Sequence, residues 1–221
     1  MIVASRGRPL AASETAEAIA DTATGDTRVV VLCDADDPEL GGYEALALPA
    51  RTHVVRWAGP QQRLGPVLSA AAVQLARHCD FVGFMGDDSR PRTSGWDEEL
   101  TGALTAPGVA YGDDLYAGER LPTAPVITAR VITALGYMCP PGIAHLYLDD
   151  FWYRLGEDLG NRCYLPDVVI EHLHPVAGKS AWDDGYRERN SAGQYSADQS
   201  AFAQFLASRW PADLARLKES L

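Results

Sequence analysis

The stretch Phe81-Val-Gly-Phe-Met-Gly-Asp87-Asp88 carries the strongest signal for both fold and chemistry. Its apolar run is typical of a buried strand, and the run ends abruptly in two adjacent carboxylates. Open α/β sheets bind ligands at the carboxyl ends of their strands, so the pair is predicted to lie at a ligand site. A hard divalent cation would relieve the repulsion between the two acids and could also bridge to a diphosphate. Gly-Asp-Asp-Ser is also a good turn sequence, and a simple turn is the alternative.

Composition and charge narrow the class of protein. The chain has 221 residues, of which 47% are hydrophobic and 22% charged, as expected of a globular protein with a sizeable core. Its formal net charge of −11 argues against a protein that coats nucleic acid, because phosphate binding needs a surplus of Lys and Arg. No apolar stretch is long enough to span a bilayer, and no signal-peptide pattern opens the sequence. The four cysteines are isolated from one another, so we expect free thiols in a cytoplasmic protein.

Strand and helix patterns alternate through the first half of the chain, which is the signature of an α/β fold. Expected strands cover 1–4, 27–33, 52–57 and 81–85, and expected helices cover 11–22, 65–78 and 96–104. Ser94 with Asp97 resembles a capping box for the last of these helices.

The second half is less regular. Short strands are expected at 109–111 and 115–116, helices at 128–135 and 149–159, and a longer strand at 164–173. Ser196 with Gln199 resembles a capping box that opens an amphipathic C-terminal helix. A second Gly-Asp-Asp, at 112–114, follows a weaker strand pattern. We expect it to line an acceptor side or to form a turn with Ala117 and Gly118, not to bind a metal.

Polar residues follow several of the expected strands. The first strand ends in Ser5-Arg6-Gly7-Arg8, a flexible turn whose backbone N–H groups and guanidinium groups can hold a phosphate or a base. The second ends in Asp34, which can accept from a base N–H or a ribose hydroxyl. Arg63 precedes a helix start, where the helix dipole favours an anion. Each feature alone is explained by a solvated turn, but together at successive strand ends they indicate a nucleotide site.

This order of features resembles the nucleotide-sugar-binding half of GT-A-type glycosyltransferases, close to glycosyltransferase family 2. The resemblance implies a GT-A-like (Rossmann-like) mixed α/β sheet flanked by helices, with a C-terminal helical tail. It also implies a donor site made by Ser5, Arg6, Arg8, Asp34, Arg63 and Asp87. Asp87 and Asp88 would form a DXD-like motif that holds Mn²⁺ or Mg²⁺ on the donor diphosphate. Ser89 stands where the strict motif has its second Asp, so the two acids would share that role.

Two later segments, His145-Leu-Tyr-Leu-Asp149-Asp150 and Glu171-His172-Leu-His174-Pro175, resemble a pattern in glycosyltransferases of actinobacterial phages. In GT-A enzymes, an acidic pair after the acceptor loop supplies the catalytic base and a later His often completes the metal site. The resemblance therefore implies a base at Asp149 or Asp150 and a metal ligand at His172 or His174. Acids are also favoured in a first helical turn, and one His could simply be packed in the core. We favour Asp149 and His172.

The expected protein is one GT-A-like domain, with a nucleotide-sugar-binding half (1–106), an acceptor and catalytic half (107–190) and a helical tail (191–221). We expect it to be a metal-dependent glycosyltransferase of the cytoplasm, or of the host cytoplasm if phage-encoded. It would move a sugar from a nucleotide sugar to a hydroxyl of a protein, saccharide or small molecule. We expect inversion at the anomeric carbon, with retention as the alternative. A modified DNA base is the less expected acceptor, because the chain carries a large negative net charge. The alternatives are a sugar-nucleotide pyrophosphorylase-like enzyme and a non-catalytic metal- or nucleotide-binding module.

Overall fold

The computed structural model describes residues 1–59, 63–174, 178–179, 187 and 191–221. Its strands are β1 (Ile2–Ala4), β2 (Val29–Asp34), β3 (Thr52–Trp57), β4 (Phe81–Gly86), β5 (Ser89–Pro91), β6 (Val109–Asp113), β7 (Val126–Thr128) and β8 (Arg162–His172). Its helices are α1 (Pro9–Thr22), α2 (Leu40–Glu44), α3 (Leu64–Leu75), α4 (Trp96–Ala103), η1 (Gly118–Arg120), α5 (Ala129–Leu135), α6 (Leu148–Leu159), α8 (Ala192–Ser208) and α9 (Trp210–Ser220).

The strands form one mixed eight-stranded sheet in the order β3-β2-β1-β4-β7-β6-β8-β5. β1 is parallel to both β2 and β4, and Ala4 pairs with Leu32 on one side and with Gly86 on the other. The loops after these three strands therefore leave the sheet at the same edge. This arrangement brings residues 5–8, Asp34 and the acidic pair to one place, where open α/β sheets bind ligands.

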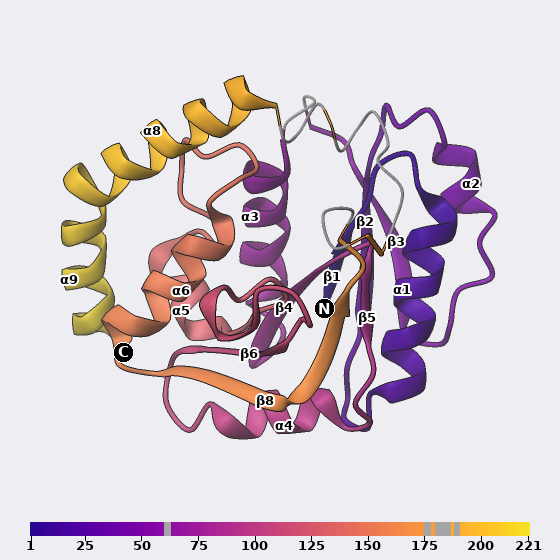
Figure 1. Cartoon of the computed structure of the whole chain (residues 1–221), viewed down its shortest axis with the longest axis horizontal. Coiled ribbons are helices and arrows are strands. Elements are labelled where there is room, and N and C mark those ends of the chain that lie inside the picture. Colours follow the sequence, from indigo (N-terminus) through magenta and orange to yellow (C-terminus); the bar gives the residue numbers. More distant parts are fainter. Residues whose placement is uncertain (60–62, 175–177, 180–186, 188–190) are drawn as a thin grey trace.

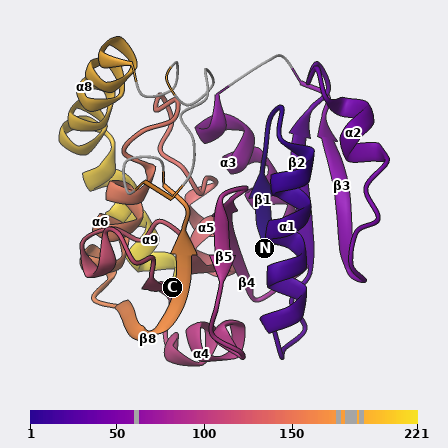
Figure 2. The same ribbon diagram turned by 45° about the vertical axis from the view of Figure 1, so that its right-hand side comes forward.

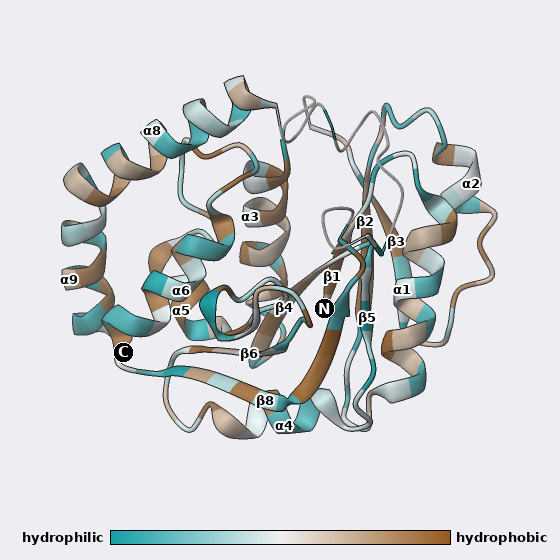
Figure 3. Cartoon of the chain, viewed as in Figure 1, coloured by the Kyte–Doolittle hydropathy of each residue, from teal (hydrophilic) through white to brown (hydrophobic). Residues whose placement is uncertain are grey.

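Helices cover both faces of the sheet. Figures 1 and 2 show α1 and α2 on one side and α3, α5 and α6 on the other, with α8 and α9 outside this second layer. Ile2 belongs to the core under α3, whereas its neighbour Val3 belongs to the core under α1. Strands that are buried on both faces consist mostly of apolar residues. Figure 3 shows this composition in the central strands of the sheet. The expected α/β fold with flanking helices and a C-terminal helical tail is confirmed.

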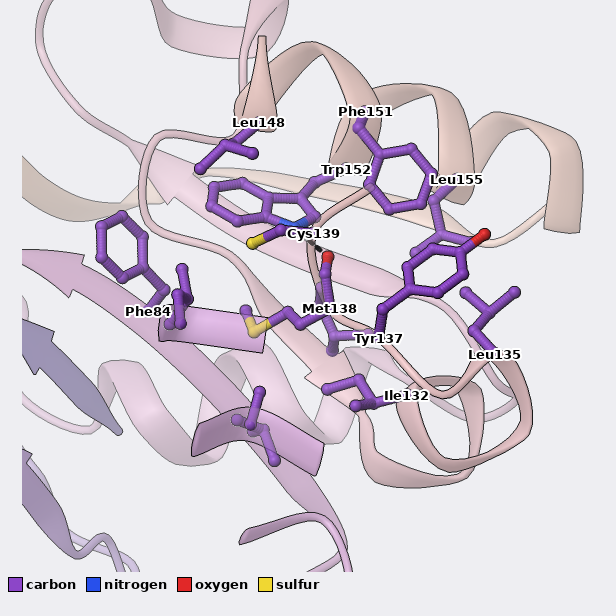
Figure 4. Close-up of a cluster of buried hydrophobic side chains, with 14 of the residues drawn as sticks. Phe84, Ile132, Leu135, Tyr137, Met138, Cys139, Leu148, Phe151, Trp152 and Leu155 are labelled. Atoms are coloured by element: carbon purple, nitrogen blue, oxygen red, sulfur yellow. Dashed lines mark hydrogen bonds between the residues drawn. The ribbon is translucent and has the colours of Figure 1, made fainter. Parts of the chain in front are cut away.

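The core on the α6 side joins the sheet to the C-terminal helices. Figure 4 shows Phe151 and Trp152 of α6 packed on the segment that carries Tyr137 and Met138. The Trp152 indole Nε1–H donates to the Met138 carbonyl at 2.9 Å, which satisfies the only polar atom of this buried ring. The ring of Phe151 lies 5.3 Å from that of Trp210, the first residue of α9. α6 is therefore fixed from two sides.

Phe151→Ala is expected to lower the free energy of unfolding by about 3–5 kcal/mol, because it leaves a cavity in a packed core. The side chain is fully buried, at 0% exposure. Urea unfolding at neutral pH measures the loss. Leu10→Ala on α1, where the side chain is 74% exposed, is the control and should change stability by less than about 0.5 kcal/mol. A loss below about 1 kcal/mol for Phe151→Ala would contradict this packing.

Several local predictions are wrong, for identifiable reasons. Residues 115–116 are not a strand, since they lie in the turn before η1. Gly95 precedes α4 with a φ of 78°, and Ser94 does not cap the helix. The Asp97 carboxylate instead accepts from Thr27 Oγ1 and from the Thr24 and Gly25 N–H groups.

The C-terminal capping box is also wrong. α8 begins four residues earlier than Ser196, and the side chain of Ser191 caps it by accepting from the Gln194 N–H. Pro211 then lies in the first turn of a separate helix, α9, so the tail is a helical pair. Within the part of the chain that the structure describes, no helix has the length and hydropathy needed to cross a membrane.

Candidate functional site

A cleft of about 720 Å³ opens at the edge of the sheet where β1, β2 and β4 end. It is lined by ten of the side chains predicted from the sequence: Ser5, Arg6, Arg8, Asp34, Arg63, Asp87, Asp88, Asp149, His172 and His174. Asp150 does not line it among the residues described. The cleft floor is apolar and includes Phe84 and Trp152. Residues separated by more than 160 positions in the chain thus converge on one cavity.

Asp87, the first acid of the pair, contacts the loop that follows β1. Its carboxylate accepts from Ser5 Oγ at 2.7 Å and from an Arg8 guanidinium nitrogen at 3.1 Å. Tyr43 supports this contact, because its hydroxyl lies 2.8 Å from Ser5 Oγ and accepts from the Arg8 backbone N–H. The Asp87 side chain is buried and is directed at the loop, and not at its neighbour Asp88.

Side chains of α1 and β5 hold the backbone of the acidic pair. The Asp87 carbonyl accepts from Thr15 Oγ1 at 2.8 Å and from the buried Arg90 guanidinium at 3.0 Å. Arg90 also pairs with Glu14 at 2.6 Å, so α1 and β5 both anchor the turn. The turn predicted at 86–89 is therefore present, and it carries the carboxylates at a fixed position in the cleft.

Asp88 faces His172 at the end of β8. Asp88 Oδ2 lies 3.4 Å from His172 Nε2, and the Leu173 N–H donates to the Asp88 carbonyl at 2.8 Å. Burial opposes ionisation of Asp88, but the hydrogen bond and charge of His172 outweigh it and hold the pKa of the carboxyl below its usual range. Burial likewise opposes a charge on His172, but Asp88 raises the pKa of the imidazole above its ordinary value.

Asp114 lies behind His172. His172 Nδ1 is buried without a hydrogen bond in the described structure, and it lies 3.9 Å from Asp114 Oδ2. The other Asp114 oxygen accepts from the N–H groups of Tyr116, Ala117 and Gly118. Asp114 thus closes a turn at Ala117 and Gly118, but the turn leads into η1 and is not the hairpin turn that the sequence suggested. The sequence did not reveal that this carboxylate also lies behind the His172 ring.

The acid–histidine pair fits one divalent cation. Neighbouring ligands of an octahedral Mg²⁺ or Mn²⁺ lie roughly 3 Å apart, close to the 3.4 Å between Asp88 Oδ2 and His172 Nε2. The described residues contain no group of three or more His, Cys, Asp or Glu side chains that could hold a metal. Mg²⁺ commonly takes only one or two carboxylates from a protein and its remaining ligands from water and substrate phosphates. Asp88 would be one such carboxylate, and His172 would add an imidazole nitrogen.

His174 lies farther out. Its ring stacks on Tyr116 with centroids 4.8 Å apart, and it meets the His172 ring edge-on at 5.0 Å. Burial and the nearby charge of His172 lower the pKa of His174 below its ordinary value.

At the opposite end of the cleft, an Arg6 guanidinium nitrogen lies 2.9 Å from Asp34 and 2.8 Å from the exposed Asp36. The Asp34 side chain is largely buried and remains part of the cleft wall. Arg63, which precedes α3, lines the same cavity. Gln61 and Gln62, just before it, lie outside the described residues.

Asp149 lies in the first turn of α6, whose N-cap is Tyr147. Burial, with the adjacent charge of Asp150, raises the pKa of Asp149 to about 6. The Asp150 N–H donates to Asp149 Oδ1 at 3.1 Å, and the Asp150 side chain is half-buried outside the cleft lining. Asp149 is thus a cleft carboxylate that can carry a proton near neutral pH.

Sequence reasoning missed several residues of the site. The cleft is also lined by Thr123, His145, Leu146 and Leu148, and the lining is supported by Tyr43, Arg90, Asp114 and Asp198. Except for the Arg90 bond to the Asp87 carbonyl, which spans three positions, the supporting contacts join residues more than 30 positions apart, and no local motif marks them. The adjacent acids at 113–114 were the one available signal, and it concerned only Asp114.

The architecture is that of GT-A glycosyltransferases. A mannosyltransferase from Pyrobaculum calidifontis, solved with GDP-Man and Mn²⁺, superposes with a TM-score of 0.60 at 14% identity, over 99% of this chain and 72% of that one. Glucosyl-3-phosphoglycerate synthase from Mycobacterium tuberculosis, solved with Mn²⁺, UDP and phosphoglyceric acid, gives 0.57 at 14% identity, over 90% and 76%. S. aureus TarS gives 0.59 at 12% identity, over 95% of this chain and 44% of that one. No protein-family model matches the sequence, and no curated protein matches it.

Proposed function

We propose that this protein is a metal-dependent glycosyltransferase that moves a sugar from a nucleotide sugar to an acceptor hydroxyl. The observation that carries the proposal is the convergence of Asp88, His172 and Asp149 in one cleft behind the first loop, on a GT-A fold. Metal-dependent glycosyl transfer needs ligands for a cation and a base for the acceptor hydroxyl. Asp88 with His172 would supply the ligands, and Asp149, a carboxylate of raised pKa, would supply the base.

The donor would lie along the sheet edge. Asp34 and Arg6 would bind the base and ribose. Arg8 and Arg63 would bind phosphate oxygens through guanidinium hydrogen bonds. Asp87 would act through the first loop, since Ser5 and Arg8 already occupy its carboxylate. The two similar structures solved with GDP-Man or UDP also contain Mn²⁺, which supports this placement.

Asp88 and His172 would hold Mn²⁺ or Mg²⁺, with His174 beside them. When bound, such an ion acts as a Lewis acid that stabilises the charge of the departing diphosphate. His172 would bind the metal through Nε2, the nitrogen that faces Asp88. Asp87 is the weaker candidate for a direct ligand, because its carboxylate is directed at Ser5 and Arg8.

Asp149 would be the catalytic base, in preference to Asp150, because it lines the cleft. The acceptor oxygen forms a bond to the anomeric carbon as the bond from that carbon to the diphosphate breaks, and Asp149 takes the hydroxyl proton. A single displacement of this kind inverts the anomeric centre. The acceptor would be a hydroxyl of a saccharide, protein or small molecule that enters beside residues 145–149.

The pH profile follows from the pKa of Asp149. A base works only when ionised, and the pKa of this carboxyl is raised to about 6. kcat/KM is therefore expected to rise with pH through about 6 and to level off above about pH 7. Initial rates between pH 5 and 8.5 at constant ionic strength measure this. A profile that is flat or falling across that range would contradict a carboxylate base.

A thermal-shift and turnover panel tests the proposal. UDP-, GDP-, CDP- and dTDP-sugars are each added with Mn²⁺ or with EDTA, and free nucleotide release is followed. One nucleotide class should raise the melting temperature in Mn²⁺ only, and its sugar should be hydrolysed slowly without acceptor. Stabilisation without turnover for any sugar or acceptor would indicate a binding module. Pyrophosphate-dependent release of a nucleoside triphosphate would indicate a pyrophosphorylase.

A further inference from the structure

Residues 144–146 belong to neither a helix nor a strand, and two of them form part of the cleft wall. His145 and Leu146 line the cavity, and the segment leads through Tyr147 into α6 and Asp149. A wall of irregular backbone needs partners for its N–H groups, and the identity of those partners determines how firmly the wall is held.

All three N–H groups of this segment donate to one side chain, Asp198 of α8. Asp198 Oδ1 accepts from Ala144 N at 3.0 Å, and Oδ2 accepts from His145 N at 3.0 Å and from Leu146 N at 2.8 Å. The carboxylate is 2% exposed, so these bonds are shielded from water. Hydrogen bonds to a charged acceptor are roughly twice as strong as neutral ones. Burial opposes the charge, but these bonds and a hydrogen bond from the Gln194 side chain outweigh it and hold the pKa of Asp198 below its usual range.

Contacts with α8 and with α3 also hold this segment in place. Tyr147 has a left-handed backbone with φ 64°, and its ring packs against Tyr195 and Phe202 of α8 at 5.4 and 5.6 Å. On the other side, the Gly65 N–H at the start of α3 donates to the Ala144 carbonyl at 2.9 Å. A Cβ at Gly65 would lie 2.4 Å from the Ile143 carbonyl oxygen, so only glycine permits this approach.

We propose that Asp198 is a positioning residue of the active site. By fixing residues 144–146, it sets the start of α6 and hence the place of Asp149 relative to the donor. Helix α8 then contributes to the function of the cleft, although none of its described residues lines it. The catalytic consequence rests on the proposed function, whereas the anchoring of the segment does not.

The test compares Asp198→Asn and Asp198→Ala with Asp213→Asn. Asp213 of α9 is a matched control, because it is an equally buried carboxylate, 4% exposed, that accepts from Tyr137, Arg209 and Arg216 and does not line the cleft. Hydrogen exchange of peptides covering residues 143–148 reports the anchoring. kcat and donor KM report its consequence, and the melting temperature reports general loss of stability.

Both Asp198 variants are expected to speed exchange at residues 144–146 by at least about tenfold, with Ala exceeding Asn because Asn keeps one accepting oxygen. kcat should fall at least about tenfold while donor KM changes less than about threefold, since a misplaced base affects the chemical step. Asp213→Asn should lower the melting temperature but leave both readouts as in the wild-type protein. Tyr195→Ala removes a ring that is 52% exposed and loosens Tyr147 without unfolding the chain, so it should give a smaller effect of the same kind.

Exchange at residues 144–146 that matches the Asp213→Asn protein would overturn the anchoring. Faster exchange with unchanged kcat would overturn the positioning role while leaving the proposed function intact. Absence of transfer in the wild-type protein with every donor would instead overturn the proposed function, and with it the catalytic part of this inference.

Discussion

Asp149→Asn is expected to lower kcat by about 10²–10⁴-fold, the usual contribution of a positioned general base, while donor affinity changes only a few-fold. The substitution preserves the shape of the side chain and the oxygen that accepts from the Asp150 N–H. It removes only the ability to take the acceptor proton. Rates with saturating donor and acceptor, together with the nucleotide dissociation constant from calorimetry, measure the two effects separately.

Asp150→Asn is the matched comparison, because the neighbouring acid lies outside the described cleft lining. We expect it to change kcat less than about fivefold, since the loss of its charge acts only indirectly on Asp149. Equal losses in the two variants would contradict the assignment of the base to Asp149. A large loss for Asp150→Asn alone would reverse it.

The Asp149→Asn protein should also be more stable than the wild type at pH 8. The pKa of Asp149 in the folded chain is about 6, above the ordinary 3.8, so the folded state favours the protonated carboxyl. That contribution is fully present below about pH 4 and is lost as the pH rises through about 6. Asn imitates the neutral form, so the stabilities of the metal-free proteins should converge near pH 4. A variant that is less stable at pH 8 would show that the buried charge is compensated.

The second large effect is expected at Asp88, which with His172 would bind the metal ion. Asp88→Asn should weaken Mn²⁺ binding by at least about 100-fold and reduce transfer by about 10³-fold, because a Lewis acid contributes several kcal/mol to stabilising the leaving diphosphate. The Mn²⁺ electron paramagnetic resonance signal measures the free ion directly and needs no activity. Asp113→Asn is the control, since that acid caps a turn by accepting from the Leu115 N–H and does not line the cleft.

Asp87→Asn separates the two acids of the motif. Because its carboxylate holds Ser5 and Arg8, we expect the variant to raise donor KM and to loosen the first loop. Its Mn²⁺ affinity should fall less than about tenfold. A larger loss of metal affinity for Asp87→Asn than for Asp88→Asn would contradict the assignment of Asp88 as the ligand.

Local sequence signals predicted the fold and most of the cleft because both depend on regular strands and their ends. The apolar run at 81–86 and the polar residues after each parallel strand needed only the rule that parallel strands share an edge. Motifs that depend on tertiary neighbours were misassigned. The Asp97 carboxylate accepts from Thr24, Gly25 and Thr27, far away in the sequence. The β5–β8 pairing that brings His172 to Asp88 joins Ser89 to His172 and Pro91 to Ile170.

The residues that support the cleft wall could not be predicted from the sequence, because their contacts also depend on tertiary neighbours. Asp198 lies in the interior of a helix whose sequence gives no sign that its side chain meets residues 144–146. Gly65 looks like an ordinary residue near a helix start until the carbonyl of Ile143 is placed against it. Such contacts are determined by the packing of α8 and α3 around the cleft, and a sequence pattern confined to one element does not contain them.

Anomalous diffraction at the manganese edge, from crystals grown with Mn²⁺ and the nucleotide selected by the thermal-shift panel, tests the central claim most directly. We expect one ion bound by Asp88 and His172 and by two phosphate oxygens, with the base near Asp34. A manganese peak at another place, or a nucleotide bound outside the cleft at the ends of β1, β2 and β4, would contradict the account.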